Sequence, residues 1–269
     1  MSADPFAQLK AIQRESWAIF SPQAMFTVPP AAALVEFAGV RDGEHVLDVA
    51  CGTGVVAVTA SRIGGRVRGL DLSPVLLEGA RKSAALIAAD IEFVEGDVEA
   101  MPYKDATFDV VLSQFGHMFA PRPEVAVAEM LRVLKPNGRI AFSTLPPELL
   151  VGRMFGLVAK YVPPPAGAAP PSAWGDPNIV RERLGNDVTG LEFHRDEMLV
   201  PTLSPQHYGA TMELTIGPIA KVVATLANEP EQLGRFRKEL HELIEKYLFR
   251  NQVRQSFLMT RAIKIGAPP

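Results

Sequence analysis

The chain has 269 residues, of which 48% are hydrophobic and one is cysteine, and its 27 basic and 30 acidic residues leave a net charge of −3. A single cysteine excludes an internal disulfide, and the near balance of charge argues against the broad positive field that attracts nucleic acid. No uncharged apolar run approaches membrane-spanning length. We expect one globular, cytoplasmic domain with neither a nucleic-acid partner nor a membrane span.

Helical and strand patterns alternate through the first half of the chain. Apolar residues at helical spacing predict a helix over 5–20, and two prolines open a second helix from Pro29 to Gly39. A short apolar strand then leads from Val46 into a Gly-x-Gly turn. The other predicted strands are 66–70, 91–95, 108–113 and 139–143, with helices over 54–63, 73–87 and 124–134 between strands. This alternation predicts a doubly wound, mainly parallel sheet whose ligands lie at the carboxyl ends of its strands.

The second half carries the rest of the sheet and a large helical insertion. The sequence predicts a helix over 149–162, a proline-rich connection over 163–171 and a helix over 172–184. Strands over 191–200 and 253–265 flank residues 205–250, which have a helical pattern. The chain therefore predicts an α/β fold with seven strands in one sheet. We divide this single domain into cap helices (1–39), a cofactor-binding core (40–145) and the remainder of the sheet with lid insertions (146–269).

The turn after the first strand predicts a nucleotide-cofactor site. Gly52 and Gly54 let the backbone approach a ligand closely, and the helix that follows points free N–H groups at it. Asp48, near the end of the strand, is the unusual residue. A carboxylate there would repel the pyrophosphate of a dinucleotide, whereas it suits a ligand with a cation, such as an ammonium or a sulfonium.

Five motifs stand in order at these strand ends. They are VLDVACGTG (46–54), DLSP (71–74), GDVEAMPY (96–103), FDVVLS (108–113) and RVLKPNG (132–138). In this order they resemble the class I S-adenosylmethionine-dependent methyltransferases, most of all the ubiquinone and menaquinone biosynthesis type and its small-molecule relatives. The resemblance covers residues 40 to 145. It implies a Rossmann-like fold, S-adenosylmethionine as the cofactor and S-adenosylhomocysteine as the product.

The resemblance also implies a set of cofactor contacts at the strand ends: Asp48, Ala50, Gly52, Gly54, Asp71, Leu72, Asp97, Val98 and Gln114. Within this set, Asp48 would hold the amino group of the methionine portion, Asp71 would accept both ribose hydroxyls, and Asp97 would accept from the adenine amino group. A carboxylate suits the ribose because it can accept two O–H donors at once. Ordinary roles stay open: a tight turn for the glycines, a cap for Asp48, a helix dipole for Asp71 and a strand-ending turn for Asp97.

The acceptor side follows from the chemistry that the resemblance implies. Methyl transfer to a small molecule is an in-line displacement, so the protein mainly aligns the reactants and excludes water. Trp17, Phe115 and His117 are the candidate substrate contacts. His117 is also the candidate catalytic base if the acceptor must lose a proton, with a purely structural histidine as an equal alternative. Aromatic and methionine residues in the cap segments suit a lipophilic or aromatic acceptor, and no metal is expected.

Two other classes of protein fit part of the pattern. The Gly-x-Gly-x-x-Ala spacing from Gly52, with an acid about 20 residues further on, also suits an NAD-dependent oxidoreductase. Asp48 and the Asp97 segment argue against it, and the sequence has no Tyr-x-x-x-Lys pair for hydride chemistry. The second alternative binds S-adenosylmethionine without transferring anything. An apolar helix could cover the pocket or a second copy of the chain, so a homodimer also stays open.

Overall fold

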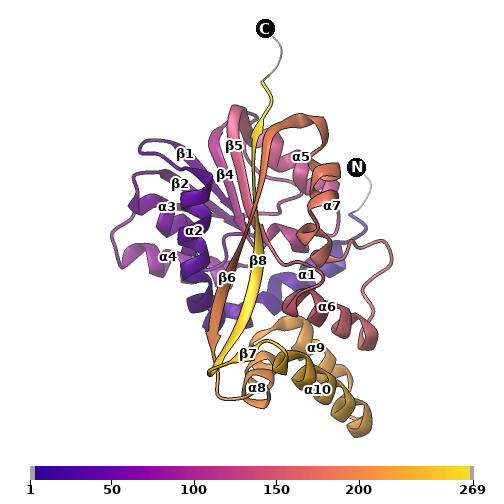
Figure 1. Ribbon diagram of the computed structural model, residues 1–269. Helices are drawn as coiled ribbons and strands as arrows, with labels where there is room; N and C mark the ends of the chain where they lie inside the picture. Colours follow the sequence, from indigo (N-terminus) through magenta and orange to yellow (C-terminus); the bar gives the residue numbers. More distant parts are fainter. Residues whose placement is uncertain (1–3, 267–269) are drawn as a thin grey trace.

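The protein is built around one central sheet. The computed structural model describes residues 4–266 of the chain. The strand order is β3-β2-β1-β4-β5-β8-β6. The seven strands on this path are β1 (His45–Val49), β2 (Arg66–Asp71), β3 (Glu92–Glu95), β4 (Phe108–Gln114), β5 (Leu134–Thr144), β6 (Val188–Pro201) and β8 (Gln252–Lys264). Strands β1 to β5 pair in parallel, whereas β8 runs antiparallel to both β5 and β6. The predicted doubly wound, mainly parallel sheet is confirmed (Figure 1).

The sheet has eight strands, one more than the sequence predicted. The extra strand, β7 (Leu248–Phe249), forms a hairpin with the start of β8. Arg250 and Asn251 close this hairpin, and both have positive φ (48° and 59°), as a tight two-residue turn requires. A two-residue strand has no room for an alternating apolar pattern, so the sequence carries no signal for it.

Helices cover both faces of the sheet. On one side lie α2 (Val28–Ala38), α3 (Val55–Arg62) and α4 (Pro74–Ala85), and on the other lie α5 (Pro123–Val133) and α7 (Pro177–Leu184) (Figure 1). Side chains from the central strands fill the space between these layers, and Leu47, Val111 and Phe142 are almost fully buried. Burial on both faces explains why these strands read as continuous apolar runs.

The N-terminal cap differs in part from its prediction. Helix α1 (Ala7–Ser16) ends earlier than expected, and a 3-10 helix, η1 (Trp17–Thr27), follows it. Pro22 lies inside η1, where it cannot donate the backbone hydrogen bond of a continuing α-helix. Helix α2 agrees with the prediction: prolines occupy its first turn, and Gly39 ends it with a left-handed φ of 63°.

The second half supplies the cap over the strand ends. Helix α6 (Leu150–Tyr161) is followed by the 3-10 helix η3 (Pro171–Gly175), which replaces the first part of a predicted longer helix. Asp176 then starts α7 by accepting a hydrogen bond from Asn178 N. Helices α8 (Pro205–Thr215), α9 (Gly217–Thr225) and α10 (Pro230–Glu245) occupy the connection between β6 and β8. They lie beyond the carboxyl ends of the parallel strands, at the bottom of Figure 1.

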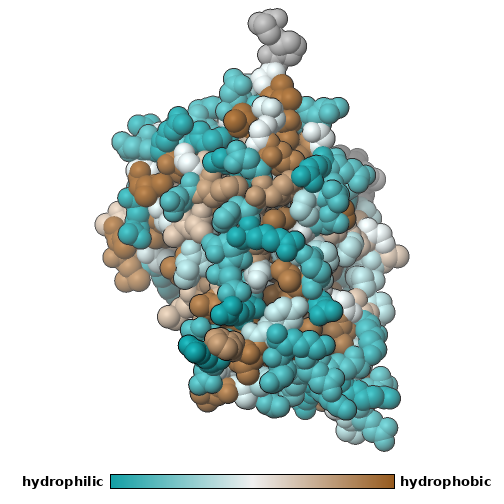
Figure 2. Space-filling model, viewed as in Figure 1, coloured by the Kyte–Doolittle hydropathy of each residue, from teal (hydrophilic) through white to brown (hydrophobic). Residues whose placement is uncertain are grey.

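The helical pattern expected over 205–250 is confirmed by α8, α9 and α10, and α10 buries one apolar side. Phe236, Leu240 and Ile244 of α10 are fully buried, and the helix packs on α6 and α8. Its other side is hydrophilic, at the lower right of Figure 2. Among the residues that the structure describes, no single helix has the length and apolar character of a membrane span. Only the pair Ala7–Pro22 and Ala24–Ala38, joined at an 83° bend, meets that test when taken together.

Candidate cofactor and acceptor site

A cavity opens at the carboxyl ends of the parallel strands, between the loops after β1, β2, β3 and β4 and the cap helices. Ten of the residues predicted for the site line it: Trp17, Asp48, Ala50, Gly52, Asp71, Leu72, Asp97, Val98, Gln114 and Phe115. The chain brings these residues to one place because parallel strands end at the same edge of a sheet. Gly54 and His117 are not among the lining residues.

Asp48 caps a helix and still has a free oxygen. Its side chain is buried, and Oδ2 accepts a hydrogen bond from Ala57 N in the first turn of α3 at 2.9 Å. Oδ1 is buried and has no hydrogen-bond partner among residues 4–266. The two open readings of Asp48 are therefore compatible, since one oxygen serves the fold and the other is available to a donor on a ligand.

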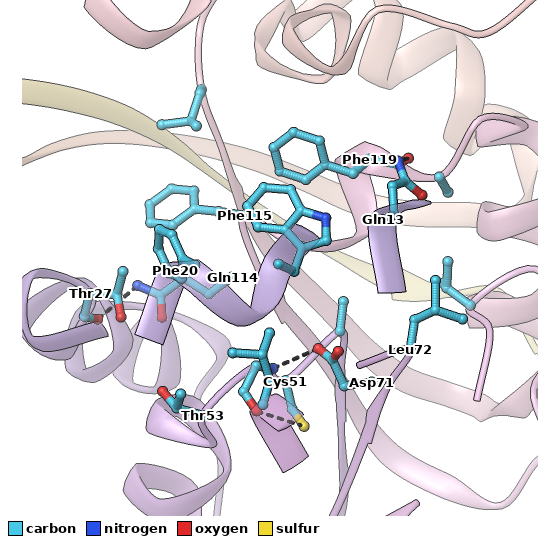
Figure 3. A pocket seen from close by; sticks show the side chains of 18 of the residues that line it. Gln13, Phe20, Thr27, Cys51, Thr53, Asp71, Leu72, Gln114, Phe115 and Phe119 are labelled. Atoms are coloured by element: carbon cyan, nitrogen blue, oxygen red, sulfur yellow. Dashed lines mark hydrogen bonds between the residues drawn. The ribbon is translucent and has the colours of Figure 1, made fainter. Parts of the chain in front are cut away.

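Asp71 organises the turn that faces it. Oδ2 accepts from Gly52 N at 2.8 Å (Figure 3). Oδ1 accepts from Ser73 N at the same distance. The carboxylate thus joins the glycine turn after β1 to the start of α4. Each carboxylate oxygen has a second lone pair, so the group can still accept hydrogen bonds from a diol in the cavity.

The burial of the two carboxylates makes this end of the cavity suited to a cation. Burial raises the pKa of Asp48 well above its ordinary value, and the neighbouring Asp71 raises it further. Burial also raises the pKa of Asp71, although N–H groups of Ser73, Gly52 and Leu72 oppose the shift. Two desolvated carboxylates that face one cavity are stabilised by a bound cation. Burial likewise raises the pKa of the lining thiol Cys51, which disfavours a nucleophilic thiolate.

Asp97 is held by Lys10, a residue outside the sequence motifs. Its Oδ1 accepts from Glu99 N at 2.9 Å, and its Oδ2 lies 2.7 Å from Lys10 Nζ. Lys10 comes from α1 and is only 8% exposed, with Nζ also 2.7 Å from Asp4 and 2.5 Å from Glu99. The acidic group Asp4, Asp97 and Glu99 therefore surrounds an ammonium. The sequence offered one indication that Lys10 reaches the cavity. Lys10 is spaced three and seven residues from Gln13 and Trp17, which also line the cavity, so the three residues share one side of the predicted helix.

Gln114 links β4 to the N-terminal cap. Its Nε2 donates to Thr27 O at 3.0 Å (Figure 3). Its Oε1 is buried without a hydrogen-bond partner in the described part of the chain. Like Asp48, Gln114 therefore brings an unused acceptor to the wall of the cavity.

The other end of the cavity is aromatic. Figure 3 shows Asp71, Cys51 and Thr53 on one side and the rings of Phe20, Phe115 and Phe119 on the other. Phe115 has a φ of 59°, an uncommon value for a residue with a side chain, at the turn that follows β4. Further apolar side chains complete the wall: Trp17, Leu145, Val151, Met154, Phe155, Met198, Met212 and Ile216.

The expected position of His117 is wrong. The side chain is completely buried outside the cavity lining, with its ring centroid 4.7 Å from both Phe142 and Trp174. Neither ring nitrogen has a hydrogen-bond partner among residues 4–266. Burial lowers the pKa of His117 from 6.5 to about 3, with a smaller contribution from Arg183. The neutral imidazole is enclosed by aromatic rings and lies outside the cavity lining.

Gly54 has a packing role in this structure. It precedes α3 with a φ of 80°, a left-handed value that favours glycine. A Cβ there would lie 3.1 Å from the Ala80 Cβ and 3.2 Å from the Phe93 ring. Gly54 therefore lets the turn approach α4 and β3, while Gly52 is the glycine of the pair that lines the cavity.

Tyr208 and Gln255 also line the cavity and were not selected as site residues. Gln255 lies on β8 between Val253 and Phe257, on the face where alternation leads to an apolar side chain. A glutamine at a strand position where the alternation calls for an apolar residue could have marked Gln255 as a site residue. Tyr208, on α8, is its hydrogen-bond partner.

Comparisons with known proteins identify relatives of this chain. Residues 47–142 match a family model described as a methyltransferase domain. An uncharacterized protein of Mycobacterium tuberculosis (strain H37Rv) is 31% identical over 261 residues, 95% of each chain. A demethylmenaquinone methyltransferase of Clavibacter sepedonicus is 40% identical over 127 residues, 45% of this chain and 50% of that protein.

Solved structures show the same fold. The YcgJ protein of Bacillus subtilis superposes with a TM-score of 0.60 at 18% identity, over 88% of this chain and 98% of that one. An N-methyltransferase of Haemonchus contortus, solved with phosphomonomethylethanolamine and S-adenosylhomocysteine, has a TM-score of 0.56 at 15% identity. That match covers 88% of this chain and 52% of the other. At these identities the likeness concerns the fold alone.

Proposed function

Because the chain belongs to the class I S-adenosylmethionine-dependent methyltransferases, we propose that its cavity binds S-adenosylmethionine and that the enzyme methylates a small, uncharged, lipophilic or aromatic acceptor. The proposal rests on one observation above all. A buried carboxylate, Asp48, keeps a free oxygen at the glycine turn and faces the same cavity as a second carboxylate, Asp71.

The residues present fit such a cofactor. Asp48 Oδ1 would accept from the ammonium of the methionine portion, since that oxygen is buried and has no other described partner. Asp71 would accept from the ribose hydroxyls with its remaining lone pairs. Leu72 and Val98 line the cavity beside Asp97 and would contact the adenine. The bound cofactor would supply an electrophilic methyl group on a sulfonium and leave as S-adenosylhomocysteine.

The protein's own part is alignment and exclusion of water. The aromatic and methionine wall would hold the acceptor in a water-poor space, where orientation lowers the barrier without acid or base catalysis. No histidine is among the lining residues, and their carboxylates lie at the strand ends of β1, β2 and β3. We therefore expect an acceptor that does not need a side-chain base near neutral pH.

The oxidoreductase alternative meets a specific obstacle. A dinucleotide places its pyrophosphate on free N–H groups at a helix N-terminus. Here Asp48 Oδ2 already accepts the Ala57 N–H of that first turn and adds a negative charge beside it. The geometry therefore favours a cationic ligand over a diphosphate.

Isothermal titration with S-adenosylhomocysteine and with NADH tests the cofactor. We expect S-adenosylhomocysteine to bind. Asp48→Asn should lower the affinity for S-adenosylhomocysteine by about 10- to 100-fold, because it removes a hydrogen bond to a charged group. The control is Asp105→Asn, whose side chain is 78% exposed and lies outside the cavity lining. Binding of NADH without binding of S-adenosylhomocysteine would overturn the proposal.

A second experiment separates an enzyme from a binding protein. The protein is incubated with a cell extract and S-adenosylmethionine that carries a deuterated methyl group. Mass spectrometry should then find products heavier by one labelled methyl, in the lipophilic fraction. Cofactor binding without any labelled product would favour the non-catalytic alternative, and products confined to polar amines would refute the lipophilic acceptor.

A further inference from the structure

A hydrogen-bonded polar pair, Tyr208 and Gln255, lies among the apolar residues that line the cavity. Tyr208 lies on α8 and Gln255 on β8, and the two side chains are 5% and 6% exposed. In the strand order, β8 lies beyond β4 and β5, on the far side from β1, β2 and β3. The pair is thus separated across the sheet from Asp48 and Asp71, which belong to the cofactor end.

The pair leaves the Tyr208 O–H unused as a hydrogen-bond donor. Gln255 Nε2 donates to the Tyr208 hydroxyl oxygen. With the Gln255 amide in this orientation, that oxygen has no second partner among the hydrogen bonds of residues 4–266, so its own O–H has no acceptor. Burial raises the pKa of Tyr208, and the hydroxyl therefore stays protonated and neutral across the physiological range. A buried donor without an acceptor is costly unless a ligand supplies one.

The surroundings restrict what that ligand can be. Met198 pairs with Gln255 across the strands, and Met212 lies one turn from Tyr208 on α8; both line the cavity. Among the lining residues the single cation is Lys10, and its ammonium already contacts three carboxylates. An anionic acceptor would therefore find no counter-charge in this wall, whereas a neutral oxygen would accept one hydrogen bond.

We propose that Tyr208 and Gln255 recognise the acceptor through a neutral oxygen, with the Tyr208 hydroxyl as donor and Gln255 holding that hydroxyl in place. This inference rests on the proposed function and makes it more specific. The substrate class is an apolar or aromatic molecule with an uncharged carbonyl, ether or hydroxyl oxygen. Tyr208 is a specificity-determining residue here, and it does not take part in the transfer itself.

Three small probes test the idea on the protein saturated with S-adenosylhomocysteine. Acetophenone carries a carbonyl oxygen, ethylbenzene has nearly the same shape without it, and benzoate carries a negative charge. Ligand-observed NMR titration gives the dissociation constant of each. We expect acetophenone to bind roughly 3- to 10-fold more tightly than ethylbenzene, the range for one net hydrogen bond, and benzoate to bind more weakly than either.

Matched variants locate the effect. Tyr208→Phe should remove the preference for acetophenone and leave ethylbenzene binding unchanged. The control Tyr161→Phe removes a hydroxyl that hydrogen-bonds Glu239 outside the cavity lining, and it should keep the preference. Gln255→Glu is a second test, because a carboxylate there would accept the Tyr208 O–H and cancel the preference with the ring still present.

The outcomes are distinct from those of the cofactor experiment. If wild-type protein does not bind S-adenosylhomocysteine, the proposed function fails. If it binds, three results overturn the Tyr208 inference alone: no acetophenone preference, a preference that survives Tyr208→Phe, or tighter binding of benzoate. Loss of the preference in Tyr208→Phe with unchanged affinity for S-adenosylhomocysteine supports the inference.

Discussion

Replacing Lys10 by methionine should destabilise the protein strongly, although the residue lies near the start of the chain. Its ammonium contacts Asp4, Asp97 and Glu99 at 2.7, 2.7 and 2.5 Å. The Lys10 side chain is 10% exposed and that of Glu99 is 1% exposed. Removing one partner of a buried ion pair costs about 3 to 5 kcal/mol, because the other charge remains buried. Arg122 still holds Glu99 after the change, so we expect the lower part of that range, about 3 kcal/mol.

Urea unfolding at neutral pH measures this loss directly. The control is Lys82→Met, which breaks a 2.6 Å pair with Glu78 whose side chains are 73% and 65% exposed. Exposed pairs of this kind contribute little to stability, because water and salt screen the two charges. The two substitutions are chemically identical, so the difference between them isolates the effect of burial. Equal losses in Lys10→Met and Lys82→Met would refute the reasoning.

The pH dependence gives a second check on the same contacts. The hydrogen bond from Lys10 lowers the pKa of Asp4 below its ordinary value of 3.8. Burial opposes the charge of Lys10, but hydrogen bonds to Asp4, Asp97 and Glu99 outweigh it and raise its pKa above 10.5. The stabilisation is therefore complete between these values. This stabilisation should decrease as the pH falls below about 4 and as the pH rises above about 10. The difference in free energy of unfolding between wild type and Lys10→Met should therefore become smaller at both extremes of pH.

Three further predictions concern the site. Asp48→Asn should stabilise the ligand-free protein between pH 5 and 8. Folding raises the pKa of the Asp48 carboxyl, so the free energy of unfolding of the wild type falls as the pH rises above 3.8, and asparagine removes this loss. Thermal unfolding without ligand measures the effect, and an unchanged melting temperature contradicts it. His117→Leu should leave kcat and its pH profile unchanged within about threefold, since the imidazole lies outside the cavity lining; a hundredfold loss in steady-state assays would restore its catalytic role. Gly116→Ala should cost about 1 to 3 kcal/mol in urea unfolding because its Cβ would lie 2.4 Å from the Ala50 Cβ. The control Gly156→Ala, with no atom within 4 Å of its Cβ and a place inside α6, should instead gain about 0.5 to 1 kcal/mol.

The parallel sheet and the carboxylate-lined end of the cavity were predictable because their signals are local. Strand period, turn residues and helix caps each span a few positions, and together they placed Asp48, Asp71 and Asp97 at one edge of the sheet. The sequence order of strands and helices then determines that these ends meet. The short strand β7 escaped because two residues cannot show a period.

The part of the cavity formed by Tyr208 and Gln255 was less predictable because these residues come from distant segments. Gln255 reaches the cavity through antiparallel pairing of β8 with β5 and β6, and Tyr208 through packing of the helices between β6 and β8. Neither event has a local signature. His117 was misplaced for a related reason: strand alternation stops at Gln114, and the left-handed turn at Phe115 then redirects the chain.

The connection that holds α8, α9 and α10 begins and ends at two residues that face each other in the sheet, Pro201 and Gln252. Since strand pairing already closes this loop, its length and sequence can change at little cost in closure entropy. Evolution could therefore exchange one continuous stretch of the gene and obtain a new acceptor chamber on an unaltered scaffold. Gln255 stays behind on the scaffold in any such exchange, so each new insert would have to offer its amide a partner, as Tyr208 does here.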